Sequence, residues 1–171
     1  MTRTIYITGS GIALGQLLPD DTYADWADWQ DPDTQKGYNF IMDTPFEQYA
    51  ARPLRHRLYA VIVRENDPDT PLGIVMISPP PSAPDLAIRV FAPYRGHGIG
   101  KTAFSLGVRY AVEQLHLSEI HAGRYEGNEV SQKMLLSCGF QRFPSGDLQE
   151  IHYLTGKPIT QYDYIFIREI I

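Results

Sequence analysis

Two glycine-rich stretches contain the residue types that bind phosphate groups in proteins. The first is TGSGIALG at residues 8–15, and the second is RGHGIGK at residues 95–101. Glycines leave backbone amides unobstructed by Cβ atoms, so the chain can wrap closely around a phosphate. A helix that begins directly behind such a loop adds the partial positive charge of its N-terminus. The segment that follows each loop therefore decides which of them predicts a cofactor site.

The first stretch lacks the helix that phosphate binding requires. It is similar to the T-G-x-x-x-A/G-x-G loop of short-chain dehydrogenases, and a Y-x-x-x-K pair follows at Tyr153 and Lys157. Pro19 follows the loop closely and prevents a helix of useful length, while Gly156 and Pro158 predict a turn around the lysine. We therefore expect a strand that ends in a turn, with a nicotinamide-dependent oxidoreductase as a remote alternative.

The second stretch is followed by the required helix. Apolar residues recur on one face of residues 101–116, which predicts a helix directly behind the loop. The chain carries a net charge of −5, yet residues 86–112 contain no Asp or Glu. The cations of this segment are Arg89, Arg95, Lys101 and Arg109. An acid-free basic segment in an acidic chain predicts an anionic ligand, to which Arg95 and Lys101 would add full charges.

The composition is that of one globular domain spanning residues 1–171. Cys138 is the only cysteine, which excludes an internal disulfide and favours a reducing, cytoplasmic location. Short apolar runs predict no membrane span, and the acidic net charge predicts no nucleic-acid partner. The histidines lack the spacing of metal ligands, so we expect no metal site.

The elements that must position the second loop alternate along the chain. Strands are expected at residues 5–7, 58–64, 72–77, 86–91, 119–125 and 163–170, and helices at 20–30, 45–51, 101–116 and 129–137. The first helix should end at Asp31 because the residue before a proline resists helical geometry. This order predicts an α/β fold of the mixed α+β kind.

Three separated motifs resemble the GNAT superfamily of acyl-coenzyme A N-acyltransferases. The stretch AIRVFAPYRGHGIGKTA contains the R/Q-x-x-G-x-G/A pyrophosphate loop, NEVSQKMLLSCGF resembles the later helix, and DWQDPDTQKGY resembles an early W-x-x-D-P segment. That last segment is similar to the branch that contains ribosomal-protein N-terminal acetyltransferases. The resemblance implies a twisted, mostly antiparallel mixed sheet flanked by helices, with a splayed V between the strand that ends at Phe91 and the strand at residues 119–125.

The resemblance also implies that acetyl-coenzyme A binds in this V as the acyl donor. The backbone around Val90 would pair with the pantetheine arm and donate to the thioester oxygen. Asn128 and Ser131 would face the cofactor, although Asn128 could equally be a helix cap. The pyrophosphate would bind to the loop and the start of the helix, at Arg95, Gly96, His97, Gly98, Ile99, Gly100, Lys101 and Thr102.

Direct transfer of an acetyl group to an amine requires a base and can use an acid. Asp85 lies where relatives often carry the base, and Glu126 is the second candidate. The family's usual tyrosine acid is replaced by Leu135, which leaves Ser131, Tyr125 or no residue in that role. The missing tyrosine keeps a non-catalytic acyl-coenzyme A-binding module open as an alternative.

The acceptor implied by the resemblance is the primary amine of a peptide N-terminus or of a small molecule. A group of acids on the first two helices predicts a cationic acceptor, and whether the chain forms a homodimer is left open. These acids are Asp20, Asp21, Asp25, Asp28, Asp31, Asp33, Asp43 and Glu47. Trp26 and Trp29 are expected in the core or, beside these acids, in an amine pocket.

Overall fold

The computed structural model describes residues 1–80 and 82–169. Its first half is an antiparallel five-stranded sheet in the order β1-β2-β3-β4-β5. The strands are β1 (Ile5–Gly9), β2 (Ile12–Gln16), β3 (Leu58–Arg64), β4 (Gly73–Ile77) and β5 (Leu86–Val90). Strand β3 reads as a continuous apolar run because helices cover both faces of this sheet. Strand β5 forms one edge, which leaves its outer backbone groups available for a ligand.

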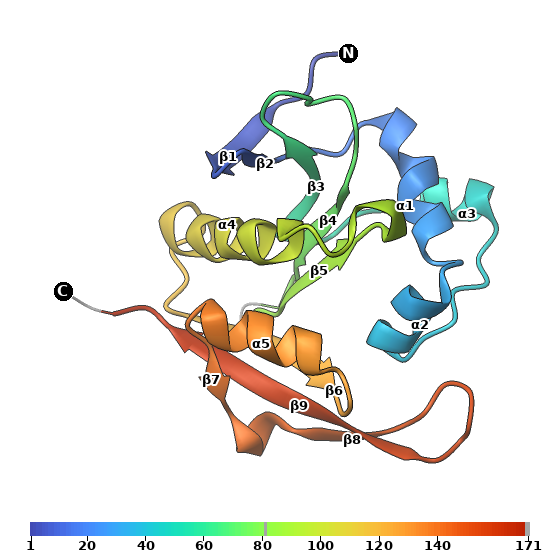
Figure 1. Cartoon of the computed structure of the whole chain (residues 1–171), viewed down its shortest axis with the longest axis vertical. Coiled ribbons are helices and arrows are strands. Elements are labelled where there is room, and N and C mark those ends of the chain that lie inside the picture. The colour runs from blue at the N-terminus through green and yellow to red at the C-terminus, as the bar shows by residue number, and fades with distance from the viewer. Residues whose placement is uncertain (81, 170–171) are drawn as a thin grey trace.

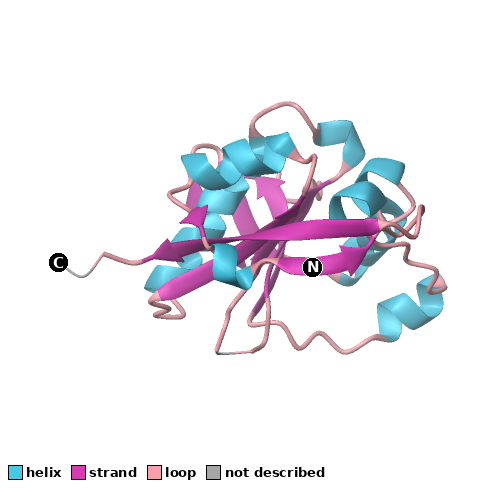
Figure 2. Ribbon diagram, turned by 90° about the horizontal axis from the view of Figure 1, so that it is seen from below, coloured by secondary structure: helices cyan, strands magenta, loops and turns pink. Residues whose placement is uncertain are grey.

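A second, four-stranded sheet follows in the C-terminal half. It contains β6 (Glu119–Tyr125), β7 (Gln141–Arg142), β8 (Leu148–Ile151) and β9 (Pro158–Ile167), with β6, β7 and β8 all antiparallel to β9. Figure 2 shows how far the strands twist across the molecule. The expected mostly antiparallel sheet flanked by helices is confirmed, and its strands form two sheets that meet at one parallel bridge between Asp85 and His121. Strands β7 and β8 were not expected, and residue 170 of the last expected strand lies outside the described residues.

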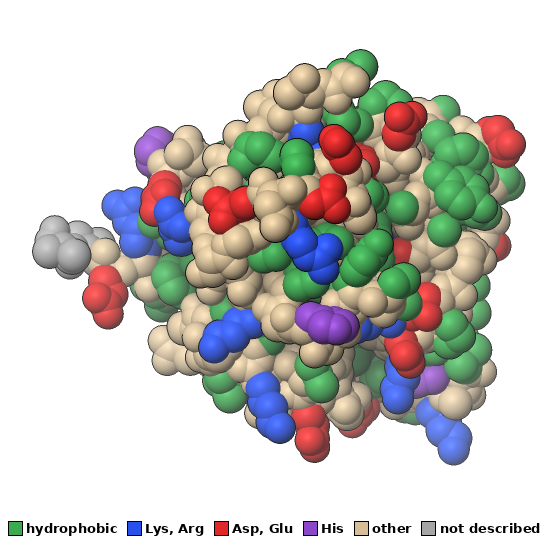
Figure 3. Space-filling model, turned by 45° about the horizontal axis from the view of Figure 1, so that its top comes forward, with side chains coloured by type: hydrophobic (Ala, Val, Ile, Leu, Met, Phe, Trp, Pro, Cys, Tyr) green, Lys and Arg blue, Asp and Glu red, His purple; other side chains and the backbone are tan. Residues whose placement is uncertain are grey.

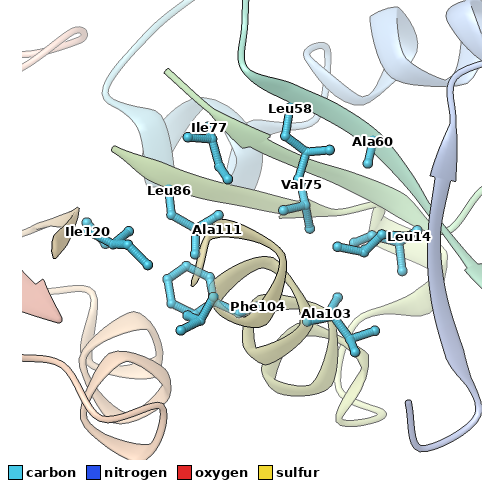
Figure 4. Packing of buried hydrophobic residues seen from close by; sticks show 14 of the residues in the cluster. Leu14, Leu58, Ala60, Val75, Ile77, Leu86, Ala103, Phe104, Ala111 and Ile120 are labelled. Atoms are coloured by element: carbon cyan, nitrogen blue, oxygen red, sulfur yellow. The ribbon is translucent and has the colours of Figure 1, made fainter. Parts of the chain in front are cut away.

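Helices cover the two faces of the first sheet differently (Figure 1). On one face, α4 (Ile99–Glu113) packs on β2, β4 and β5, and α5 (Glu129–Ser137) packs on α4 and β6. Figure 4 shows the core between this face and α4, where Phe104 and Ala103 meet Leu14, Val75 and Leu86. On the other face lie α1 (Thr22–Asp28), α2 (Pro32–Tyr38) and α3 (Phe46–Ala51). The short 3₁₀ turns are η1 (Pro19–Asp21), η2 (Ala92–Tyr94) and η3 (Pro144–Gly146).

The first glycine-rich stretch is a β-hairpin. Ser10 and Gly11 both have positive φ angles, 53° and 80°, and join β1 to β2 as a two-residue turn of the kind that right-twisted hairpins favour. The expected strand and turn are confirmed, the second strand was missed, and no helix follows. The oxidoreductase interpretation is therefore wrong, because this stretch has no helix N-terminus to face a pyrophosphate.

Helix α1 ends at Asp28, three residues earlier than the expected end at Asp31, and Asp31-Pro32 begins the next helix. The expected helix at residues 20–30 is α1, and Pro32 is the first residue of α2, where a proline needs no hydrogen-bond partner for its nitrogen. The Asp31 side chain accepts from the backbone amide of Thr34 at 3.0 Å and caps α2. Among the described residues, no helix is long and apolar enough to cross a membrane.

Candidate active site

Strands β5 and β6 start together and then separate, which forms the expected V. The His121 amide donates to the Pro84 carbonyl at 2.8 Å where they meet, and beyond it each strand pairs only within its own sheet. By the register with β4, Ile88 and Val90 direct their backbone groups into the V. The Tyr38 hydroxyl donates to the Ile88 carbonyl at 2.6 Å, and Arg95 Nε donates to the Val90 carbonyl at 2.9 Å. The amides of Ile88 and Val90 are thus the donors left facing this space.

The second glycine-rich stretch has the geometry of an anion-binding loop. Gly96 and Gly98 have φ angles of +81° and +75°, which only glycine adopts readily, and a Cβ at either position would meet nothing within 4 Å. Gly98 caps α4 without a side-chain hydrogen bond, so the first amides of the helix point outward. Ile99 is 6 % exposed and anchors the helix start, whereas Lys101 is exposed. Such an open loop at a helix N-terminus can accommodate a phosphate group.

The Arg95 guanidinium is committed elsewhere. It forms an ion pair with Asp31 at 2.8 Å and donates to the Thr34 hydroxyl at 2.6 Å, while its Nε holds Val90. The Arg95 hydrogen bond and the Thr34 amide, working against partial burial, lower the pKa of Asp31 below its usual value. The sequence predicts that the Arg95 charge faces a phosphate; in the structure the Arg95 side chain ties the loop to α2 through Asp31 and Thr34.

Arg89 is likewise used inside the protein. It is 4 % exposed, pairs with Asp25 and with Asp28 at 2.9 Å, and lies over the Trp29 ring at 4.5 Å. Trp29 is therefore a packing residue of this cluster. Two of the four cations in the acid-free segment, Arg89 and Arg95, therefore pair with acids at α1 and at the start of α2. Acids that remain exposed on this side of the molecule include Asp20, Asp33, Asp43 and Glu47.

Asp85 lines a cavity of about 340 Å³, which lies on the face of β5 and β6 opposite to α4 and α5. His121 and Asp163 line the same cavity, with His121 Nδ1 2.9 Å from the Asp163 carboxylate. Burial among these groups, then the negative charge of Asp163, raise the pKa of Asp85 to about 7, against the opposing effect of His121. The Asp85 side chain is reached by solvent within the cavity, and water limits the size of this shift.

Gly146 of η3 packs closely against Asp163 at the wall of the cavity, where an added Cβ would collide with the Asp163 carboxylate. The residues that line the cavity are Ala83, Asp85, His121, Gly123, Phe143, Gly146, Leu148, Gln161 and Asp163. A carboxyl group poised near neutral pH in such a cavity can accept a proton from an ammonium group.

The other expected site residues lie outside this cavity. Glu126 is exposed, and its carboxylate accepts from the Thr160 amide at 3.0 Å. Asn128 accepts from the Ser131 amide at 3.1 Å, which confirms it as the cap of α5. Leu135 is 1 % exposed and belongs to the core. Neither Ser131 nor Tyr125 lines the cavity.

Three residues of this site were not predicted from the sequence, namely Tyr38, His121 and Asp163. For His121 a local signal existed, because alternate residues of the expected strand (His121, Gly123 and Tyr125) share one face. Tyr38 and Asp163 come from distant segments, and no local pattern joins them to Asp85.

Comparisons with known proteins agree with this geometry. The family model for the acetyltransferase (GNAT) domain matches residues 11–141. A GNAT-family acetyltransferase from Bacillus anthracis shares the fold with a TM-score of 0.78 and 13 % identity, over 94 % of this chain and 97 % of that one. A search of curated proteins found no match.

A spermidine N-acetyltransferase from Vibrio cholerae, solved with CoA and spermine, superposes with a TM-score of 0.79 and 15 % identity, over 93 % of this chain and 96 % of that one. At these identities the likeness establishes a shared fold, and the family match covers most of the sequence. The chain therefore belongs to the GNAT acetyltransferase family and uses acetyl-coenzyme A as its acyl donor.

Proposed function

We propose that the protein transfers an acetyl group directly from acetyl-coenzyme A to a primary amine, with Asp85 as the general base. The observation that carries this proposal is the position of Asp85, where β5 and β6 meet, in a cavity on the face away from α4. Members of this family bring cofactor and acceptor together at such a V. A neighbour of the same fold acts on spermidine, which supports an amine acceptor.

The cofactor is proposed to enter from the α4 side. Gly96, Gly98 and the first amides of α4 would hold its pyrophosphate, and the Ile88 and Val90 amides would receive its acyl and pantetheine carbonyls. Bound acetyl-coenzyme A supplies an activated acetyl thioester. The remaining loop positions, His97, Gly100 and Thr102, are proposed to contribute through backbone amides or, for Thr102, a hydroxyl at the helix start.

The acceptor amine is proposed to approach from the cavity side. Amines are protonated at neutral pH and cannot attack a carbonyl until a proton is removed. Asp85 would take this proton, and burial together with the neighbouring Asp163 charge would favour the protonated form, because both raise the pKa of Asp85. The acceptor itself is proposed to be the N-terminus of a peptide or a small primary amine.

A thiol-release assay with acetyl-coenzyme A across an amine panel tests the proposal. The panel contains a peptide N-terminus, an aminoglycoside, a polyamine and simple alkylamines. Release of coenzyme A above the rate of hydrolysis with at least one amine is expected, together with the acetylated amine by mass spectrometry. Coenzyme A binding without release for any amine would instead identify a non-catalytic acyl-coenzyme A-binding module.

A further inference from the structure

Glu150 lies on the acceptor side of the second sheet. The register pairs Tyr125 with Gln161, Gln161 with Leu148, and Glu150 with Ile159. Residues opposite each other in antiparallel strands share a face, and alternate residues of one strand do so too. Glu150 therefore projects from the same face as Tyr125, Gln161 and Leu148, the last two of which line the Asp85 cavity.

The Glu150 carboxylate is only partly satisfied. Burial, and then the nearby Glu150 carboxylate, raise the pKa of the Tyr125 hydroxyl. Glu150 Oε2 is buried and has no hydrogen-bond partner among residues 1–80 and 82–169. An ionised carboxylate accepts about four hydrogen bonds, so this carboxylate has accepting capacity to spare. The other buried atoms without partners, Asp28 Oδ1 and Arg89 Nε, belong to the ion-pair cluster of α1 and β5.

The end of β8, next to Glu150, is tied to the C-terminal end of α2. Asn39, at the C-terminal end of α2, donates from Nδ2 to the Ile151 carbonyl at 2.9 Å and accepts at Oδ1 from the Tyr153 amide at 2.9 Å. These bonds join the acceptor-side helices to the end of β8. A half-buried carboxylate that is short of donors, on a strand anchored at its end, is suited to bind a cation.

We infer that Glu150 binds a second ammonium group of the acceptor, so that the preferred substrates are linear amines with two cationic ends. One end would lie toward Asp85 and react, and the other would donate to Glu150 Oε2. An ammonium group supplies three donors and a full charge, which match this carboxylate. The inference rests on the proposed function, because it concerns the acceptor of the same reaction.

The test compares 1,4-diaminobutane with 1-aminopentane, in which a methyl group replaces the second amine. The wild-type kcat/KM for the diamine should exceed that for the monoamine by ~10–100-fold, beyond the twofold advantage of two equivalent amines. In Glu150→Gln this ratio should collapse to within about threefold. Glu65→Gln, which removes an exposed carboxylate from the β3–β4 turn far from β8, should keep the wild-type ratio.

The outcomes separate this inference from the proposed function. Turnover of both amines with equal efficiency by the wild type would overturn the Glu150 site and leave the N-acetyltransferase proposal intact. If no amine is acetylated, the proposed function itself is wrong. Glu150→Asp keeps the negative charge on a shorter side chain. If Glu150→Asp keeps the preference for the diamine and Glu150→Gln loses it, the result supports a role of the charge. Should Glu150→Gln not fold, the wild-type comparison still decides, since equal kcat/KM values for the diamine and the monoamine would refute the site.

Discussion

Replacement of Asp85 by asparagine removes the proposed base while preserving the size of the side chain. The wild-type enzyme should gain activity as the pH rises through about 7, because Asp85 must lose its proton before it can accept one from the acceptor. Asparagine cannot accept that proton, and deprotonation of the ammonium then falls to water. We expect kcat/KM at pH 7 to drop by ~10²–10⁴, the usual contribution of a positioned general base.

The pH profile distinguishes this role from a structural one. The deficit of Asp85→Asn should shrink toward pH 10, where the amine arrives already neutral. Asp163→Asn should move the rise in the wild-type profile to lower pH, because the like charge that helps to raise the Asp85 pKa is gone. Steady-state thiol release from pH 5.5 to 10 gives both profiles, with the exposed Asp69→Asn as the control.

Two results would refute this reasoning. One is an Asp85→Asn enzyme with wild-type kcat/KM at neutral pH. The other is an equal loss at pH 7 and pH 10 with unchanged coenzyme A affinity, since a lost base is not needed when the amine is neutral. Either result would move the role to Glu126 or to water.

Three further predictions concern stability and cofactor binding. The folded state raises the pKa of Asp85 above its unfolded value, so the stability of the protein falls as the pH rises from about 4 to about 7. Asp85→Asn should therefore raise the free energy of unfolding at pH 8 by up to ~1 kcal/mol, after allowance for solvent. Urea titration at pH 4 and pH 8 measures this effect, and an equal effect of the substitution at both pH values would contradict the prediction. Gly98→Glu should weaken coenzyme A binding by ~10²–10⁴-fold in calorimetric titration. Gly11→Ala, also at a position with positive φ, should lower the free energy of unfolding by about 1 kcal/mol and leave coenzyme A binding unchanged. The reverse pattern would place the cofactor site in the β1–β2 hairpin. Arg95→Gln breaks the bonds to Asp31, Thr34 and Val90 and should lower the free energy of unfolding by ~1–3 kcal/mol, which corresponds to about 2–4 °C in Tm per kcal/mol. The control Arg109→Gln, at an exposed arginine, should change the free energy of unfolding by less than ~0.5 kcal/mol. Equal melting temperatures for the two variants would disprove the proposed tie between the loop and α2.

Most of the elements that carry the site follow from local patterns. Strands β3 and β6 and helix α5 have the expected bounds, because apolar periodicity, the Asn128 cap and Gly139 act over a few residues. The short strands β7 and β8 escaped prediction because they owe their pairing to β9 rather than to their own composition. Pro32 was taken only as a helix end, although proline is also a favoured first residue.

The sequence does not show which of its charges pair with one another, because the partners lie far apart in the chain. Arg89 meets Asp25 across 64 positions, and Arg95 meets Asp31 across the same separation. Charge counted along the sequence predicts an anionic ligand at one segment and a cationic acceptor at another. Part of the positive charge of the first segment is paired with part of the negative charge of the second. The net field at a site depends on these pairings, which only the folded chain makes.

The geometry of the Gly96–Gly100 loop follows from local sequence, because glycines at positive φ followed by an uninterrupted helix are local requirements of backbone geometry. The family follows from motifs that lie in order along the chain. The proposed acceptor side depends instead on contacts that form only in the folded chain. The cavity of Asp85, His121 and Asp163 and the unsatisfied carboxylate of Glu150 arise where β5, β6, β8 and β9 are brought together. Such contacts join residues that are distant in sequence, and their distances and burial have no counterpart in any local pattern.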